Sequence, residues 1–298
     1  MKWALVLSGG AGNGFSHLGV LKALEELDLR PDVIAGTSIG AIIGGAYACG
    51  MEVEDFEELL QDFNLFDYLE GRSFQFRAGA ITRFLQAQES VNRMLSSRGA
   101  DGGTKILEFL YRITNNCSFS ETRIPFYCNA VDLLRGSEVL LHRGSVAEAM
   151  RASMAFPGIF TPVERGEMLL CDGSVADNMP VWIPRSLGYK RVIAVCATPR
   201  RRAEPEDVAN GFAIFLRAFT IACYGQTRFP MDRPTLELYP NREDTSFDFS
   251  RYEETIQAGY DELMARKREV KRALSPFSGL WSFIQSREAP TPGPTNPC

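Results

Sequence analysis

The sequence contains only two histidines, His17 and His142, and its seven cysteines include no C-x-x-C pair. Zinc sites take several cysteine or histidine ligands at short spacings, so no metal site is expected. An odd number of scattered cysteines is typical of reduced thiols rather than of a disulfide framework. A catalytic histidine, if the protein uses one, must be His17 or His142.

Long apolar runs and an excess of positive charge are also missing. No segment approaches the roughly 20 apolar residues that a membrane-spanning helix needs. The apolar stretch at residues 3–7 is too short for a signal peptide and fits a buried strand better. The formal net charge is −5, which argues against a nucleic-acid partner. These absences favour a cytoplasmic protein that does not bind nucleic acid.

The 298 residues are 45% hydrophobic and 23% charged, which is enough apolar material for a sizeable core. Short apolar runs alternate with helical patterns, and residues 52–119 are mainly helical and amphipathic. The predicted strands cover residues 3–7, 32–35, 126–130, 138–142, 168–171 and 191–196, and the clearest helices cover 17–29, 41–49, 146–154 and 208–229. Strands interleaved with helices predict an α/β fold with a largely parallel sheet covered on both faces.

The segment Gly36-Thr37-Ser38-Ile39-Gly40 fits the pattern G-x-S-x-G between a predicted strand and a helix of small residues. That context is typical of a nucleophile elbow, a turn so tight that side chains at both glycine positions would clash. The Ser38 hydroxyl would then be exposed, beside helix amides that favour a developing oxyanion. The alternative is a glycine-rich turn without catalysis.

The base that activates Ser38 has two candidate sources. An α/β-hydrolase triad runs serine, acid, histidine along the chain, so His142 would need an acid such as Asp132. His17, at the opening of a predicted helix, fits a structural or helix-capping role. The better candidate is Asp172, which ends a predicted apolar strand and precedes Gly-Ser. Its alternative is an ordinary Asp-Gly turn.

A glycine-rich segment, residues 8–14, joins the first predicted strand to the first predicted helix. Its amides could line an anion site at the helix N-terminus. A dinucleotide site would need G-x-G-x-x-G and an acidic residue at the end of the second strand. Phe15 occupies the place of the last glycine, and no carboxylate ends that strand. An oxyanion hole beside Ser38 fits better.

Taken together, these elements resemble the patatin-like phospholipase family. Four ordered blocks carry the likeness: residues 7–21, 36–40, 153–163 and 170–181. It covers roughly residues 1–200 and is greatest to small bacterial members related to the catalytic domain of neuropathy target esterase. The resemblance implies a three-layer α/β/α sandwich with a mostly parallel central sheet. We expect an acyl hydrolase domain at residues 1–275 and a C-terminal segment at 276–298, which is partly disordered because its last twelve residues include four prolines.

The implied activity is that of a serine lipid acyl hydrolase that needs neither calcium nor any other cofactor. Asp172 would take the Ser38 proton as the hydroxyl attacks an ester carbonyl, and water would then hydrolyse the acyl-enzyme. The implied substrates are phospholipids, lysophospholipids or other lipid esters. The candidate amide donors of the oxyanion hole are those of Gly9, Gly10, Ala11, Gly12 and Ile39.

Three positions depart from the family pattern. Ala11 stands where the family has a third loop glycine, and Asn13 stands where a basic residue is usual. These two changes are expected to affect the catalytic rate more than the type of reaction. Ser174 replaces glycine or alanine after the Asp-Gly pair, a small change that we expect the site to tolerate.

Two other functions share parts of this pattern. An acyltransferase would form the same acyl-enzyme and pass the acyl group to an alcohol, thiol or second lipid. Acyl-carrier transacylases of similar fold use a Ser–His pair, for which no histidine is well placed. A non-catalytic binding or scaffold protein would be consistent with the changes at Ala11 and Asn13.

A basic cluster at residues 266–272 is followed by an apolar and aromatic segment at 277–284. Basic residues can meet anionic head groups while Trp and Phe enter the membrane interface. We therefore expect peripheral membrane contact through the C-terminal region. The alternative is that the cations complement a helix dipole and that the apolar segment packs on the core.

Overall fold

A computed structural model of the protein describes residues 2–61, 98–99, 101–198, 203–224, 233–243 and 249–275. The C-terminal segment expected at 276–298 lies outside the described residues, as do residues 62–97 of the helical region expected at 52–119. Within the described ranges, no helix is both long and apolar enough to cross a membrane.

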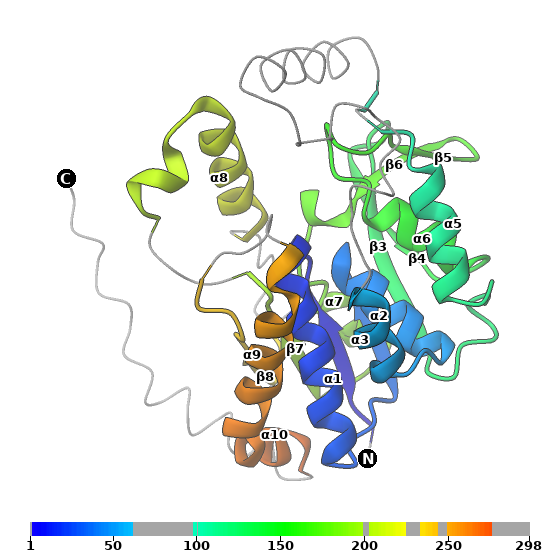
Figure 1. The fold of residues 1–298 in the computed structure, drawn as a ribbon. Coiled ribbons are helices and arrows are strands. Elements are labelled where there is room, and N and C mark those ends of the chain that lie inside the picture. Colours follow the sequence, from blue (N-terminus) through cyan, green and yellow to red (C-terminus); the bar gives the residue numbers. More distant parts are fainter. Residues whose placement is uncertain are drawn as a thin grey trace.

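Among the described residues, an eight-stranded sheet forms the centre, with helices on both faces (Figure 1). Its strands are β1 (Ala4–Leu7), β2 (Val33–Gly36), β3 (Phe126–Asp132), β4 (Ser137–Leu141), β5 (Val163–Arg165), β6 (Met168–Asp172), β7 (Val192–Val195) and β8 (Leu236–Leu238). The strand order is β5-β6-β3-β2-β1-β7-β8, with β4 also paired to β3. Five neighbouring strands, β3-β2-β1-β7-β8, are parallel to one another. Strands β4, β5 and β6 run antiparallel to the strands with which they pair. The expected mostly parallel sheet is confirmed.

The helices are α1 (Ser16–Glu26), α2 (Ile39–Cys49), α3 (Val53–Gln61), α5 (Thr104–Ile113), α6 (Val146–Ser153), α7 (Trp182–Ser186), α8 (Gly211–Tyr224), α9 (Tyr252–Ala265) and α10 (Lys267–Leu274). The helix expected at 41–49 starts two residues earlier and ends at Cys49, before Gly50, whose φ of 102° is the left-handed value typical of a helix stop. The helix expected at 208–229 is observed only as α8, and residues 225–229 lie outside the described residues.

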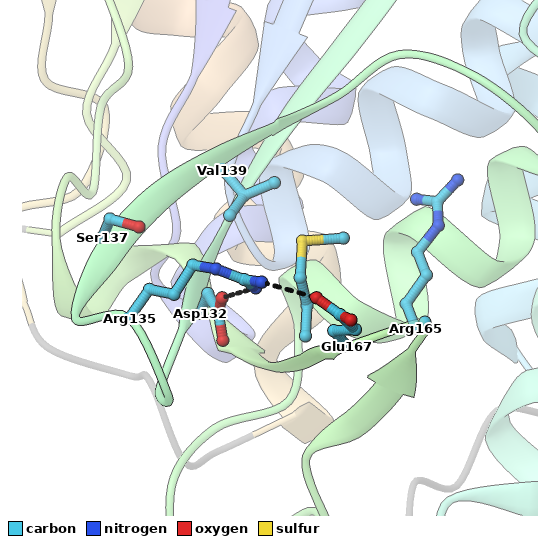
Figure 2. A pocket seen from close by; sticks show the side chains of 8 residues that line it. Asp132, Arg135, Ser137, Val139, Arg165 and Glu167 are labelled. Atoms are coloured by element: carbon cyan, nitrogen blue, oxygen red, sulfur yellow. Dashed lines mark hydrogen bonds and ion pairs between the residues drawn. The ribbon is translucent and has the colours of Figure 1, made fainter.

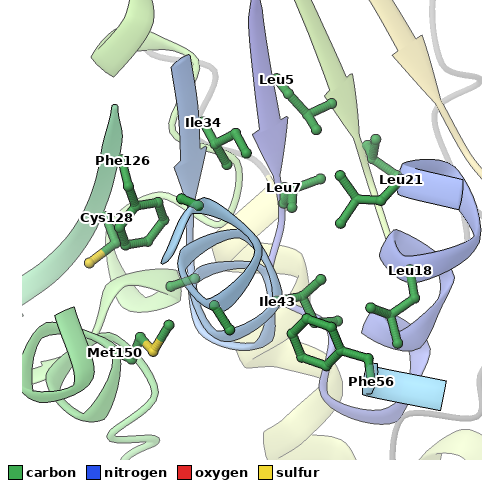
Figure 3. Close-up of a cluster of buried hydrophobic side chains, with 14 of the residues drawn as sticks. Leu5, Leu7, Leu18, Leu21, Ile34, Ile43, Phe56, Phe126, Cys128 and Met150 are labelled. Atoms are coloured by element: carbon green, nitrogen blue, oxygen red, sulfur yellow. The ribbon is translucent and has the colours of Figure 1, made fainter. Parts of the chain in front are cut away.

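Alternate residues of the central strands face opposite sides of the sheet. Leu5, Leu7 and Ile34 face the larger apolar cluster with α1 and α2 (Figure 3). Val6 and Ala35 face the smaller cluster, which includes residues of α7. Both faces of the central parallel strands are therefore buried, which gives the three-layer α/β/α arrangement expected from the sequence.

The parallel strands also decide where a site can form. Loops that follow parallel strands gather at the carboxyl edge of the sheet, where open α/β sheets bind their ligands. The segments after β1 and β2 both leave the sheet at this edge, because Leu7 pairs with Gly36. Asp172 ends the antiparallel strand β6 and pairs with Ala130 in β3. The register thus brings three candidate segments to one region.

Candidate active site

Ser38 occupies the sharp turn between β2 and α2, with φ 53° and ψ −122°. This backbone conformation is rare for a residue with a side chain. A Cβ at Gly36 would lie 2.5 Å from the carbonyl oxygen of Gly40, and one at Gly40 would lie 2.3 Å from that of Leu7. Both glycines are therefore required by close backbone contacts, as expected for a nucleophile elbow.

Asp172 lies at the end of β6 and is 1% exposed. Its amide donates to the carbonyl of Ala155 (3.0 Å), and its Oδ1 accepts a hydrogen bond from the amide of Ser174 (2.8 Å). Burial raises the pKa of Asp172 from 3.8 to about 6, although hydrogen bonds from the Ser174 amide and from the hydroxyls of Ser38 and Ser174 act in the opposite direction. The influence of the Ser38 hydroxyl on this pKa shows that the two predicted catalytic side chains lie near each other.

The glycine-rich segment follows β1 and lies beside the elbow. A Cβ at Gly9 would come within 3.3 Å of Cβ of Ser38 and 2.5 Å of Oδ1 of Asn178. The amide of Gly9 donates to the carbonyl of Asn178 (3.2 Å). Gly9 therefore permits the close approach of the loop to Ser38, but its amide already has an acceptor.

The remaining loop amides begin a short 3₁₀ helix, Ala11–Phe15. The amide of Asn13 donates to the carbonyl of Gly10 (3.1 Å), and the amides of Ala11 and Gly12 precede this bond. Amides in the first turn of a helix have no partner within the helix. Ala11 has a φ of 45°, so alanine adopts the left-handed backbone that favours glycine.

At the elbow itself, several amides are already engaged. The amide of Ser38 donates to Oγ of Ser153 (3.0 Å), that of Gly40 to the carbonyl of Thr37 (2.8 Å), and that of Ala41 to the carbonyl of Ser38 (2.9 Å). Ile39 is the first residue of α2, so its amide also lies in a first turn. Of the five predicted oxyanion donors, Gly9 already donates its amide to a carbonyl, whereas Ala11, Gly12 and Ile39 lie in the first turns of helices.

A buried asparagine in β3 connects the elbow to the segment after Asp172. Oδ1 of Asn129 accepts a hydrogen bond from the hydroxyl of Thr37 (2.7 Å), and its Nδ2 donates to the carbonyl of Asp177 (2.8 Å) and to Oε1 of Glu138 (2.9 Å). Sequence reasoning missed this residue. The one feature of the sequence that could have indicated Asn129 is that a polar residue interrupts the apolar run of β3.

A second missed residue, Asn241, fixes the glycine-rich loop. Its Nδ2 lies 2.9 Å from the carbonyl oxygen of Asn13, 2.6 Å from that of Ala197 and 3.2 Å from Oγ of Ser16. The 3₁₀ helix is thereby tied to the segment after β7. No sequence signal marked Asn241, because it follows a three-residue strand that the apolar pattern did not reveal.

Among the described residues, no hydrogen bond joins either histidine to Ser38 or to Asp172. His17 is fully buried and its Nε2 donates to the carbonyl of Ser8 (2.8 Å), while burial lowers its pKa to about 4. This neutral ring supports the structural role that the sequence favoured. His142 instead lies beside the ring of Tyr127, with ring centroids 6.2 Å apart.

Asp132 is committed elsewhere, so it does not form a triad with His142. Its carboxylate binds Arg135 (2.8 Å) and accepts hydrogen bonds from the amides of Leu134 and Leu169. Asp132 pairs with Ser137 at one end of the β3–β4 hairpin, whereas His142 follows Leu141 at the other end. Ser137 and Leu141 are four steps apart along β4, which corresponds to about 13 Å.

A surface cavity of 420 Å³ lies beside this ion pair rather than at Ser38. Figure 2 shows Arg135 placed between Asp132 and Glu167, with Arg165 at the margin. Asp132 lines this cavity, but neither Ser38 nor Asp172 nor any residue of the predicted oxyanion loop does. Within the described parts of the chain, no group of three or more acidic, histidine or cysteine side chains could hold a metal ion.

The chain's sequence matches the patatin-like phospholipase family over residues 5–185. It is 28% identical over 287 residues to lysophospholipase NTE1 of Saccharomyces cerevisiae, covering 86% of this chain and 16% of the yeast protein. It is 32% identical over 216 residues to an uncharacterised NTE family protein of Mycobacterium tuberculosis (strain H37Rv), covering 70% of this chain and 53% of that protein. The chain thus spans about a sixth of the yeast relative and about half of the mycobacterial one.

Among solved structures, VipD from Legionella pneumophila is similar with a TM-score of 0.53 and 16% sequence identity. The similarity covers 89% of this chain and 66% of VipD, and it supports the fold alone. An α/β/α sandwich with a serine elbow and a nearby strand-end aspartate is the architecture of a patatin-type protein. The chain belongs to the patatin-like phospholipase family and is related to its NTE members.

Proposed function

We propose that this protein is a serine lipid acyl hydrolase in which Ser38 is the nucleophile and Asp172 is its general base. The observation that carries the proposal is that the Ser38 hydroxyl lies near enough to the buried Asp172 carboxylate to lower its pKa. Membership in a phospholipase family and the name lysophospholipase of the yeast relative support phospholipids or lysophospholipids as the substrate class.

In the proposed reaction, Oγ of Ser38 attacks the ester carbonyl carbon as its proton passes to Asp172. The carbonyl oxygen gains the negative charge and is stabilised by amides of Gly10, Ala11, Gly12 and Ile39. Collapse of this intermediate breaks the ester bond, and the alkoxide leaving group takes the proton from Asp172. Water then attacks the acyl-enzyme by the same route, and the fatty acid leaves. A pKa of about 6 keeps Asp172 ionised at neutral pH, as this role requires.

The test compares hydrolysis of a lysophospholipid and of a short p-nitrophenyl ester by wild type, Ser38→Ala, Asp172→Asn and the double variant. Each single change is expected to lower turnover by on the order of a thousandfold, and the double variant little further, because the two groups act as a unit. Asp132→Asn is a matched control, since it also alters a buried strand-end carboxylate. Substantial activity in Asp172→Asn together with loss in His142→Ala would refute the pairing.

Two outcomes would replace hydrolysis by another function. If the wild type hydrolyses the p-nitrophenyl ester no faster than the Ser38→Ala variant does, a binding or scaffold protein would be favoured. Faster ester consumption on adding an alcohol or lysolipid, with an acylated acceptor as product, would favour an acyltransferase, which shares the acyl-enzyme step.

Peripheral membrane contact through the C-terminal region is part of the proposal. The apolar segment 277–284 lies outside the described residues, but α10 before it is described. The carbonyl of Ser275 accepts a hydrogen bond from Nε of Arg191, directly before β7 (3.0 Å). The end of α10 therefore lies at the amino edge of the parallel strands, opposite the edge where Ser38 follows β2. Contact there would hold the protein at a surface without facing Ser38 towards it.

A second apolar surface lies closer to the proposed site. Helix α8 contacts the turn after Asp172, and its Phe219 packs edge-on against Phe156, with ring centroids 5.2 Å apart. Ile214 and Ile221 on α8 are 53% and 58% exposed.

Sedimentation with anionic vesicles can show whether the C-terminal region or α8 makes the membrane contact. Weaker binding of a chain ending at Ser275 would support the C-terminal contact, whereas loss of binding only in an Ile214→Asn, Ile221→Asn variant would assign the contact to α8.

A further inference from the structure

The amide of Ser38 has an acceptor that lies 115 residues away in the sequence. Oγ of Ser153, the last residue of α6, accepts its hydrogen bond at 3.0 Å, and Ser153 is fully buried. Ser38 adopts φ 53° and ψ −122°, and such conformations cost on the order of 1–3 kcal/mol unless the surrounding structure fixes them. The Ser153 hydroxyl is one of the contacts that fixes this turn.

The same short segment also contacts the base. Two residues after Ser153, the carbonyl of Ala155 accepts a hydrogen bond from the amide of Asp172 (3.0 Å). Ala155 is also fully buried. The segment Ser153–Ala155 therefore binds the backbone at both Ser38 and Asp172, and its fixed length constrains the distance between them.

Packing of α6 makes this segment a rigid support. The helix begins with a capped turn, in which Oγ of Ser145 accepts a hydrogen bond from the amide of Glu148 (3.3 Å). A Cβ at Gly45 of α2 would lie 2.4 Å from Cε of Met150, so the missing side chain allows α6 to approach α2 closely. This approach brings the end of α6 within hydrogen-bonding distance of the residue that precedes α2.

We propose that Ser153 is a positioning residue for the Ser38–Asp172 pair, an inference that rests on the proposed function. By accepting the Ser38 amide hydrogen, its hydroxyl holds the elbow in the conformation that directs the Ser38 Oγ towards the Asp172 carboxylate. Ser153 acts through the backbone of Ser38 and takes no part in bond making. Its bond also occupies the Ser38 amide, which leaves the oxyanion to the amides of the glycine-rich loop and Ile39.

The experiment uses Ser153→Ala, which removes the acceptor, and Ser153→Thr, which keeps a hydroxyl at the same place. Ser153→Cys fills the site but offers only a weak sulfur acceptor, so it substitutes for the alanine variant if that variant does not fold. Thr114→Val is the matched control. Thr114 is 1% exposed, its hydroxyl donates to the carbonyl of Leu110, and it lies near the start of α6 rather than its end.

The measurements are kcat and KM for a p-nitrophenyl ester, the rate at which a fluorophosphonate labels Ser38 with loss of fluoride, and the melting temperature. Ser153→Ala is expected to lower kcat and the labelling rate by about 10- to 100-fold with little change in KM, because a displacement of about 1 Å can cost that much. Ser153→Thr should recover most of the loss. Thr114→Val should lower the melting temperature without lowering kcat.

Wild-type kcat and labelling in Ser153→Ala, or in Ser153→Cys where alanine prevents folding, would overturn the inference. A loss that the melting temperature fully explains and that Ser153→Thr does not recover would overturn it as well. Ser38→Ala separates this failure from that of the proposed function. If Ser38→Ala is inactive and Ser153→Ala is normal, only the positioning role is wrong, whereas an active Ser38→Ala variant removes the proposed function itself.

Discussion

Replacing Asp172 by asparagine is expected to stabilise the folded protein at neutral pH while it removes activity. Asp172 is buried, and burial raises its pKa from 3.8 to about 6. The folded protein keeps this proton up to about pH 6, whereas the unfolded chain releases it near pH 3.8. Between these values the folded state binds more protons, so the free energy of unfolding falls as the pH rises.

The size of this effect follows from the two pKa values. Each pH unit between them corresponds to about 1.4 kcal/mol, so the wild type loses about 3 kcal/mol in total, most of it before pH 6. About 2 kcal/mol of this falls between pH 4.5 and pH 7.5. Asparagine does not titrate, and its Oδ1 can keep the hydrogen bond from the Ser174 amide. The variant should therefore gain stability relative to wild type over that interval.

Urea unfolding at pH 4.5 and pH 7.5 measures the difference in unfolding free energy between wild type and Asp172→Asn. The change in this difference with pH is the decisive quantity, because packing effects of the substitution are the same at both values. We expect it to move by about 2 kcal/mol in favour of the variant at pH 7.5. A difference that stays constant between the two pH values would show that Asp172 titrates normally and would refute this reasoning.

The remaining predictions concern the loop, the cofactor and the tuning of the base. Ala11→Gly should keep or raise kcat, because glycine adopts a positive φ freely, whereas Ala11→Val should lower kcat and the melting temperature. Because the proposed mechanism uses backbone amides to stabilise the oxyanion, hydrolysis should continue in the presence of a chelator. Activity that returns only when calcium is added back would contradict this. Ser174→Ala removes a hydroxyl donor from the Asp172 carboxylate, so the midpoint of the kcat/KM profile should rise above about pH 6. An unchanged midpoint would deny Ser174 that influence.

Elements and site residues could be predicted from the sequence where their structure depends on residues close to them in the chain. The elbow could be predicted because Gly36 and Gly40 are required within one tight turn, and the strand before it and the helix after it have clear periodicities. The position of Asp172 at the end of an apolar strand, just before a turn, could be predicted for the same reason. The strands β5 and β8 were missed because three residues are too few to show an alternating pattern.

Long-range contacts explain what sequence could not supply. Asn129 contacts Thr37 across 92 residues, and Asn241 contacts Asn13 across 228. Ser153 lay within a block that resembled the family, but no local rule connects it with Ser38. Such contacts depend on the register of parallel strands and on the close approach of α2 and α6, which only the folded chain reveals.

In the proposed mechanism, the environment of Asp172 explains how a single carboxylate could serve as the base without a histidine. A solvated aspartate ionises near 3.8 and is a weak base, whereas full burial without donors would keep it protonated at neutral pH. The observed site lies between these limits, because the Ser174 amide and the hydroxyls of Ser38 and Ser174 offset part of the effect of burial. A pKa of about 6 leaves the carboxylate ionised at pH 7 yet much more basic than in water, which is the compromise that general-base catalysis favours. The stability expected to be lost at neutral pH is thus a direct consequence of the same burial that would make Asp172 a suitable base for Ser38.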